Sequence, residues 1–253
     1  IGADIYCDTA LICRVIDDMY PENTIYPEAQ AGTDNAVAQW TDSFFLKVCA
    51  GLVFQPKAAA ANPLFQDEEK RKAFVADRIN LTGGSNDLQM ALETAEPYFL
   101  AHLDRLDTQL GGSQPFLGGE TPSIADFSTY HNCWFVNERD VLRDMFDPFR
   151  HVIAWYDRMV DFGHGEFEMI SGAAALDAAI RSEPDEVPES VFVEDFEVGQ
   201  EVDVLPIDYG RQPVRGELLI AGLDEIAVVR NDDQAGRMVV HFPRMGFEIQ
   251  PVN

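Results

Sequence analysis

The chain has 253 residues, 46% of them hydrophobic, which is enough to bury one sizeable core and a second, smaller one. Its 44 acidic residues outnumber its 18 lysines and arginines, so the formal net charge is -26. Because a field of this sign repels polyanions, and no basic cluster interrupts it, we expect neither a nucleic acid nor an anionic membrane as a partner.

The four cysteines show neither C-x-x-C spacing nor a histidine at metal-ligand spacing. We therefore expect no metal site, no disulfide framework and a reducing, cytoplasmic setting. The sequence has no run of about 18 apolar residues and no basic-then-apolar leader, so we expect no membrane span and no uncleaved signal peptide. The chain begins without Met and enters a buried strand at once, which we interpret as a truncated start.

The first motif is a strand that leads directly into a helix, in residues 5–19. Apolar residues at positions 11, 12, 15, 16 and 19 form the stripe of an amphipathic helix, and Pro21 stops it. Asp8 is the expected N-cap. The unpaired N–H groups of a helix start attract an anion and Asp8 suits an ammonium, so Asp8 and Thr9 are candidates for binding an α-amino acid head. The alternative is an ordinary N-cap with no ligand.

Apolar periodicity, broken by glycine and proline, predicts further helices over about 34–54, 67–81, 86–110, 123–136, 147–161 and 172–181. In the first of these, Trp40, Phe44 and Phe45 recur at roughly helical spacing. They are candidates for a second-substrate pocket, although such a stripe more often packs in a core or a dimer interface. His131 and His241 lie in apolar segments without a visible acidic partner, and we interpret them as structural.

Ser123 and Asp126 form a Ser-x-x-Asp pattern ahead of an apolar run. This is a capping-box variant, in which each side chain accepts a backbone N–H of the other residue. We predict that the pair fixes the start of a buried helix and has a structural rather than a catalytic role.

The composition changes at residues 182–190, where acidic residues and two prolines predict an extended linker. Short β-branched segments then follow at 191–193, 201–204, 217–220, 226–229 and 238–242. They predict a small β barrel or sandwich. Five arginines of this tail form either an interaction face or ordinary solvated turns: Arg211, Arg215, Arg230, Arg237 and Arg244.

Several motifs follow the strand-to-helix joint in a fixed order: Leu103–Leu106, Phe116–Gly119, Pro122–Asp126 and Trp155–Met159. In this order they resemble the glutathione transferase family, which joins a thioredoxin-like domain to an all-helical domain. The resemblance implies a multi-domain α+β protein. Its expected parts are the end of a thioredoxin-like domain (1–21, front half missing), an all-helical domain (34–181), an acidic linker (182–190) and a β domain unusual for the family (191–253).

In the family, an acid followed by Ser or Thr holds the γ-glutamyl end of glutathione, which implies this role for Asp8 and Thr9. The family's activating Tyr, Ser or Cys and its cis-proline loop would lie before residue 1, so the sequence names no catalytic residue. Cys7 is a poor substitute because the adjacent carboxylate raises the pKa of its thiol. We expect Cys7 to be structural.

The resemblance implies a homodimer that uses glutathione as co-substrate, without a metal, and whose glutathione thiolate attacks an apolar electrophile. Glutathione-dependent isomerisation, lyase-type ether cleavage and dehalogenation would use the same site. The alternative is a non-catalytic scaffold with the same fold, in which the β tail is an interaction module.

Overall fold

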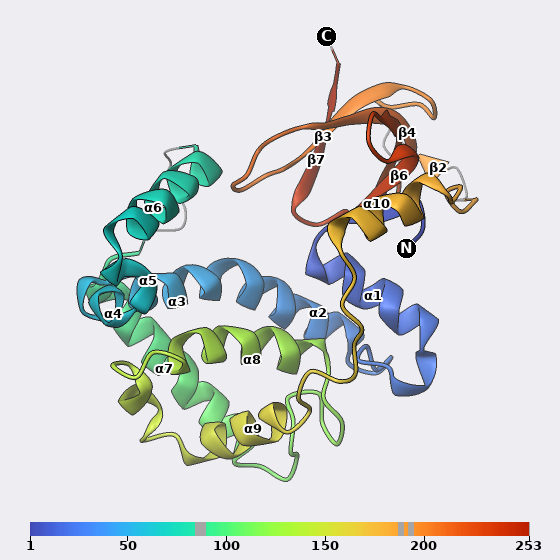
Figure 1. Ribbon diagram of the computed structural model, residues 1–253. Coiled ribbons are helices and arrows are strands. Elements are labelled where there is room, and N and C mark those ends of the chain that lie inside the picture. The colour runs from blue at the N-terminus through green and yellow to red at the C-terminus, as the bar shows by residue number, and fades with distance from the viewer. Residues whose placement is uncertain (84–89, 187–189, 192–194, 253) are drawn as a thin grey trace. The chain divides into compact units, whose positions relative to one another are not determined.

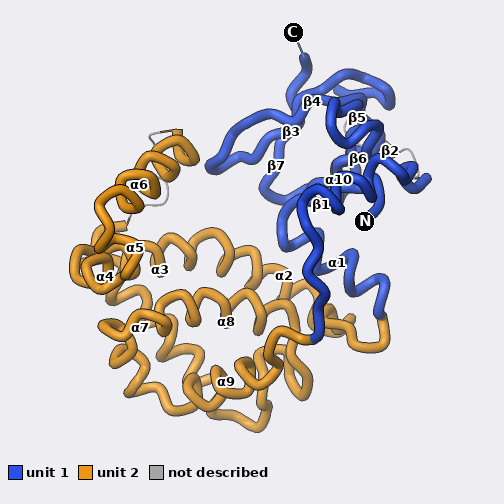
Figure 2. The backbone as a smooth tube through the Cα atoms, in the orientation of Figure 1, with its two compact units in different colours: residues 1–20, 166–253 blue, residues 21–165 orange. Residues whose placement is uncertain are grey.

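The computed structural model describes residues 1–83, 90–186, 190–191 and 195–252. The chain forms two compact units, coloured separately in Figure 2. The sheet unit combines residues 1–20 with 166–253, and the helical unit comprises residues 21–165. Each unit has its own buried hydrophobic core. The predicted mixed α+β class is confirmed.

The helical unit is built from helices (Figure 1). They are η1 (Pro21–Asn23), α2 (Ala31–Trp40), η2 (Thr41–Phe45), α3 (Leu46–Val53), α4 (Pro56–Ala61), α5 (Pro63–Gln66), α6 (Glu68–Thr82), α7 (Leu92–Leu110), α8 (Ile124–Asn137), η3 (Arg143–Phe146) and α9 (Arg150–Val160). The helix predicted over 86–110 begins at Leu92, and residues 84–89 lie outside the described part of the chain.

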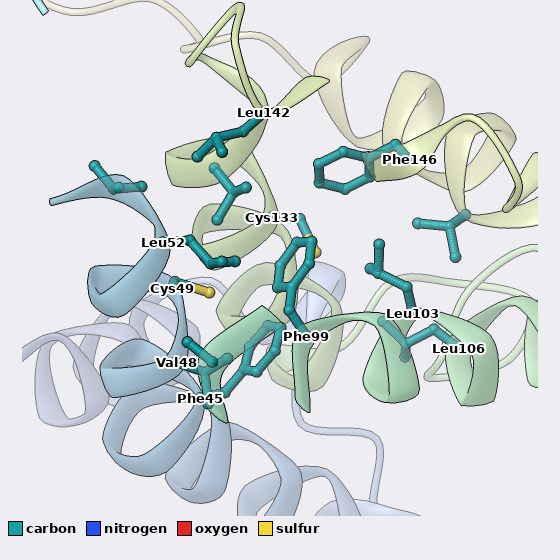
Figure 3. Close-up of a cluster of buried hydrophobic side chains, with 14 of the residues drawn as sticks. Phe45, Val48, Cys49, Leu52, Phe99, Leu103, Leu106, Cys133, Leu142 and Phe146 are labelled. Carbon is teal, nitrogen blue, oxygen red and sulfur yellow. The ribbon is translucent and has the colours of Figure 1, made fainter. Parts of the chain in front are cut away.

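Residues at helical spacing build the core of this unit. In α7, Phe99, Leu103 and Leu106 are buried at positions i, i+4 and i+7, and together form one face of the helix. Figure 3 shows this face against Phe45 and Leu52, which come from η2 and α3. Full burial of each such side chain contributes about 1.5–3 kcal/mol, so the apolar stripes determine which helix faces meet.

Two further differences from the predicted helices have a local explanation. The helix predicted over 34–54 contains a π-helical turn, η2, where the Thr41 hydroxyl donates to the carbonyl of Val37 at 2.7 Å. The sequence Asn62-Pro63 lies between the helices predicted over 34–54 and 67–81, yet it starts the short helix α5. The Asn62 side chain caps it by accepting the Leu64 N–H, and proline is well suited to a first helical position.

In its described residues, the sheet unit contains one seven-stranded sheet and two helices, α1 (Thr9–Met19) and α10 (Gly172–Ile180). The strands are β1 (Asp4–Tyr6), β2 (Ser190–Val191), β3 (Glu201–Pro206), β4 (Val214–Ala221), β5 (Glu225–Asp232), β6 (Gly236–Pro243) and β7 (Phe247–Pro251). Their order is β1-β6-β5-β4-β3-β7, and β2 pairs with β4. Strand β7 was not predicted, and residues 192–193 of the first predicted tail strand lie outside the described residues.

Strand β1 belongs to the same sheet as the tail strands. It pairs with β6 in parallel, with Asp4, Ile5 and Tyr6 opposite Val239, Val240 and His241. Helix α10, which we expected in the helical domain, buries Ala179 in the core of the sheet unit. The first 20 residues and the tail therefore form one compact unit, whereas the expected boundaries placed them in separate domains. Pairing between distant strands is not visible in local composition.

No helix in the described ranges is both long and apolar enough to cross a membrane.

Candidate functional site

The strand-to-helix joint of the sheet unit places Asp8 in a strained backbone conformation. Its φ is 69° and its ψ is 137°, and among the residues that the structure describes it is the one non-glycine residue with positive φ. Such a conformation costs about 1–3 kcal/mol and persists only where the surrounding structure imposes it, which is common at ligand sites. The Asp8 Oδ1 accepts the N–H of Ala10 at 3.0 Å, so Asp8 is the N-cap of α1.

Thr9 is the first residue of α1 and, like Asp8, is exposed. Its N–H has no acceptor inside the helix, and it lies at the positive end of the helix dipole. Leu11, which is 5% exposed, is the buried residue of this helix. At the joint, the N–H and hydroxyl of Thr9 are suited to bind the carboxylate of a ligand. The Asp8 carboxylate beside them is suited to bind its ammonium.

Cys7 precedes this joint and does not have the properties of a reactive cysteine. Burial, and next the charge of Asp8, raises the pKa of its thiol. Its side chain packs against the core of the sheet unit. The thiolate form is therefore disfavoured at neutral pH, as the sequence predicted.

The proposed second-substrate residues divide between the core and the surface of the helical unit. Phe45 is fully buried and stacks on Phe99, with ring centroids 5.7 Å apart. Trp40 and Phe44 are 38% and 39% exposed. The ring of His102 lies 4.9 Å from that of Trp40, and burial lowers the pKa of His102 to about 4, so the histidine is neutral at pH 7. Trp40 and Phe44 present ring surface to solvent, whereas Phe45 supplies packing.

The capping box at the start of α8 is present. The fully buried Asp126 carboxylate accepts the backbone N–H groups of Leu117, Gly118 and Ser123 at 2.7, 2.9 and 3.0 Å. It also accepts the indole N–H of Trp155 at 2.8 Å. Asp126 therefore links a loop, a helix start and α9, which is a structural role.

The arginines of the tail are largely paired within the sheet unit. Arg215 forms a bidentate pair with Asp203 at 2.9 and 2.8 Å, Arg230 lies 3.6 Å from Asp232, and Arg211 pairs with Glu248. The hydrogen bonds from Arg215 lower the pKa of Asp203. These ion pairs reduce the positive charge that this part of the tail can offer to a partner.

Sequence reasoning missed a buried cluster on the sheet. His241, which is 2% exposed, has Nδ1 2.5 Å from Glu225 Oε1 and Nε2 3.1 Å from Asp4 Oδ1. The acids lie 16 and 237 residues away in the sequence, so only the strand pairing reveals them. No group of three or more His, Cys, Asp or Glu residues in the described ranges is arranged to hold a metal ion.

Comparison with known proteins identifies related folds. The family model described as "Glutathione S-transferase, C-terminal domain" matches residues 89–158. The crystal structure of a GST-like protein from Pseudomonas syringae is 33% identical, with a TM-score of 0.78 over 99% of this chain and 80% of that one. No curated protein matches.

A lower similarity extends to two other solved structures. Beta-etherase LigF from Sphingobium sp. strain SYK-6 is 18% identical over 61% of this chain and 69% of that one, with a TM-score of 0.45. A glutathione S-transferase from Rhodospirillum rubrum F11 is 14% identical over 66% and 67%, with a TM-score of 0.42.

Proposed function

Because this chain belongs to the glutathione S-transferase family, we propose that it binds reduced glutathione and brings its thiolate to an electrophilic small molecule. Asp8 receives the ammonium of the γ-glutamyl end, and the Thr9 N–H and hydroxyl receive its carboxylate. The observation that carries this assignment is the positive φ of Asp8, because the fold maintains a strained acidic residue at the start of a helix.

In the proposed reaction the glutathione sulfur forms a bond to an electrophilic carbon, and the leaving group departs with its electron pair. The thiol proton is released beforehand, which requires donors that lower the thiol pKa. We assign this role to no residue of the chain. Trp40 and Phe44 are the proposed apolar contacts for the electrophile, since their rings are exposed.

The net charge of -26 opposes this binding, because glutathione is itself an anion at neutral pH. Binding therefore depends on the local donors at the start of α1. Salt screens charges beyond about 10 Å at 0.1 M, so added salt weakens the long-range repulsion more than the contacts at Thr9. We expect glutathione affinity to rise, not fall, between low and physiological ionic strength.

The test is calorimetric titration of reduced glutathione into the full-length protein and its variants. Asp8→Asn removes the charge but keeps a capping side chain that tolerates positive φ, and Thr9→Ala removes the hydroxyl. Both together should abolish binding, whereas Ser171→Ala, which changes the cap of α10, should leave it intact. Unchanged affinity in the double variant would refute the site. No binding by the unmodified protein at millimolar glutathione would favour the non-catalytic scaffold.

We also propose that the protein is a homodimer, as in the family. Sedimentation that shows a monomer at micromolar concentration would contradict this.

A further inference from the structure

His241 lies on β6, between β1 and β5, and each of these neighbouring strands supplies one acid to its ring. It is opposite Ala227 on β5 and opposite Tyr6 on β1. Glu225 and Asp4 are each two residues away from these partners, so they are the diagonal neighbours that long side chains can reach. The small Ala227 leaves room on one side, and the Tyr6 ring stacks on the imidazole at 4.5 Å with an interplanar angle of 18°.

When both acids are ionised, the hydrogen bonds of the cluster require a doubly protonated imidazole. An ionised carboxylate only accepts hydrogen bonds, so each ring nitrogen that faces one must carry a proton. Burial lowers the pKa of His241, but the hydrogen bonds and charges of Glu225 and Asp4 outweigh burial and raise it. Tyr6 stacks on the imidazole, and Asp185 donates its backbone N–H to Asp4. Burial, and next the charges of the nearby acids, raises the pKa of Tyr6.

The cluster joins three segments that are far apart in the sequence. Asp4 on β1 accepts the His241 Nε2–H with Oδ1, and with Oδ2 it accepts the backbone N–H of Asp185 at 2.9 Å. The backbone carbonyl of His241 accepts the N–H of Cys7 at 2.9 Å. Cys7 directly precedes Asp8. His241 therefore holds Asp4 of β1 with its side chain and Cys7, at the start of the joint, with its backbone carbonyl.

We propose that His241 is a positioning residue that holds β1 through Asp4 and Glu225 and thereby fixes the Asp8–Thr9 joint in the geometry that receives glutathione. The inference rests on the proposed function. It also gives the tail a role, because β5 and β6 support the strand that carries the binding site. Loss of the His241 proton removes one of the two donors and leaves a buried carboxylate facing a lone pair, so β1 is held less firmly.

Two substitutions separate this role from general stabilisation of the fold. His241→Asn cannot donate to both acids and should lower glutathione affinity. Asp4→Asn can keep both hydrogen bonds of this side chain while the histidine is neutral. The amide oxygen accepts the Asp185 N–H, and the amide NH₂ donates to Nε2 of the neutral imidazole. Asp4→Asn should therefore keep the affinity but lose its dependence on the His241 proton. Asp203→Asn breaks an ion pair on β3 and β4 of the same sheet and serves as the control.

The experiment measures the Kd of S-methylglutathione, which has no ionisable thiol, between pH 6 and pH 8.5 for the full chain and its variants. NMR of ¹⁵N-histidine follows His241 in the same samples. We expect His241→Asn to raise the Kd at pH 6 by about tenfold to a hundredfold, because a joint that is held less firmly spends a smaller fraction of the time in the binding geometry. In the unmodified protein the Kd should rise as the imidazole loses its proton, and Asp203→Asn should behave like the unmodified protein.

Two results would overturn the proposal. One is an unchanged Kd in His241→Asn, and the other is an affinity whose pH dependence survives Asp4→Asn. If the unmodified protein binds no S-methylglutathione at any pH, the proposed function fails instead. Hydrogen exchange of the Cys7 amide then tests whether His241 holds the joint. The proposal predicts faster exchange in His241→Asn, and an unchanged exchange rate would refute it.

Discussion

Each unit of the molecule contains a buried carboxylate, but the two are satisfied in different ways. In the helical unit, Asp126 is surrounded by neutral donors, namely backbone N–H groups and the indole of Trp155. In the sheet unit, Asp4 is 3% exposed and accepts a ring N–H of His241, a donor that can lose its proton. Asp126 therefore keeps its donors at any pH near 7, whereas Asp4 depends on a proton that its partner can lose.

The comparison shows how a fold can place similar groups in a fixed or a pH-dependent environment. Three of the neutral donors around Asp126 are backbone N–H groups of a helix start and a loop close to it in the sequence, so most of the arrangement forms with the local backbone. The donor to Asp4 comes from the far end of the chain, so the interaction exists only when the sheet is assembled. We expect the hydrogen bonds of Asp126 to contribute mainly to stability, and the hydrogen bond between Asp4 and His241 to link β1 to the tail.

The largest expected effect is the loss of the carboxylate in the helical unit. Asp126→Ala leaves three backbone N–H groups and one indole N–H without their acceptor, and each buried unsatisfied donor costs about 1–3 kcal/mol. We expect the free energy of unfolding in urea to fall by about 3 kcal/mol or more. Asp126→Asn keeps one acceptor oxygen and should cost less. A loss below about 1 kcal/mol for Asp126→Ala would mean that water or other groups replace the carboxylate.

The next effect distinguishes the two carboxylates by pH. The pKa of His241 is raised in the folded state, so the folded chain binds this proton more tightly than the unfolded chain. The resulting stability is complete below the unfolded value of about 6.5 and is lost as the pH rises through the folded value. For one proton, the free energy of unfolding falls by at most about 1.4 kcal/mol per pH unit as the pH rises.

Urea unfolding at a series of pH values measures this slope. His241→Asn should remove the contribution, whereas Asp126→Asn should leave the slope unchanged. The contrast between the two units would be lost if both variants changed the slope equally.

A smaller effect compares buried and exposed helix caps. Ser123 is fully buried at the start of α8, whereas Ser171 caps α10 at the surface. Replacing a serine cap by alanine costs about 1 kcal/mol, and water can take over part of the role at an exposed site. Ser123→Ala should therefore destabilise the chain by about 1 kcal/mol in urea unfolding, and Ser171→Ala by less. If Ser171→Ala destabilised the chain more than Ser123→Ala, burial of the cap would not explain the difference.

The smallest effect concerns the strain at the joint beyond β1. Asp8→Gly and Asp8→Ala both remove the capping carboxylate, but only glycine adopts positive φ without strain. We expect the glycine variant to be more stable than the alanine variant by up to about 1 kcal/mol in thermal or urea unfolding. Equal stability would mean that the conformation of Asp8 relaxes when its side chain is removed.

The sequence predicted the parts of the molecule that local chemistry specifies. The stripe over residues 9–19 gives α1, whose N-cap is Asp8, and the Ser-x-x-Asp pattern gives the capping box of α8. The order of motifs indicated the glutathione transferase family, and the similarity to the Pseudomonas syringae structure confirms it. The helix stripe and the two caps depend on residues that are close in the sequence or that recur at helical spacing, so they could be predicted without the fold.

Only the tertiary structure determined which distant segments meet. The pairing of β1 with β6 joins the first 20 residues to the tail, and it brings Asp4 to a histidine 237 residues away. The positive φ of Asp8 was likewise not visible in the sequence. The physical reason is that strand pairing and backbone strain are set by long-range contacts, whereas periodicity and capping arise within a few residues of the chain.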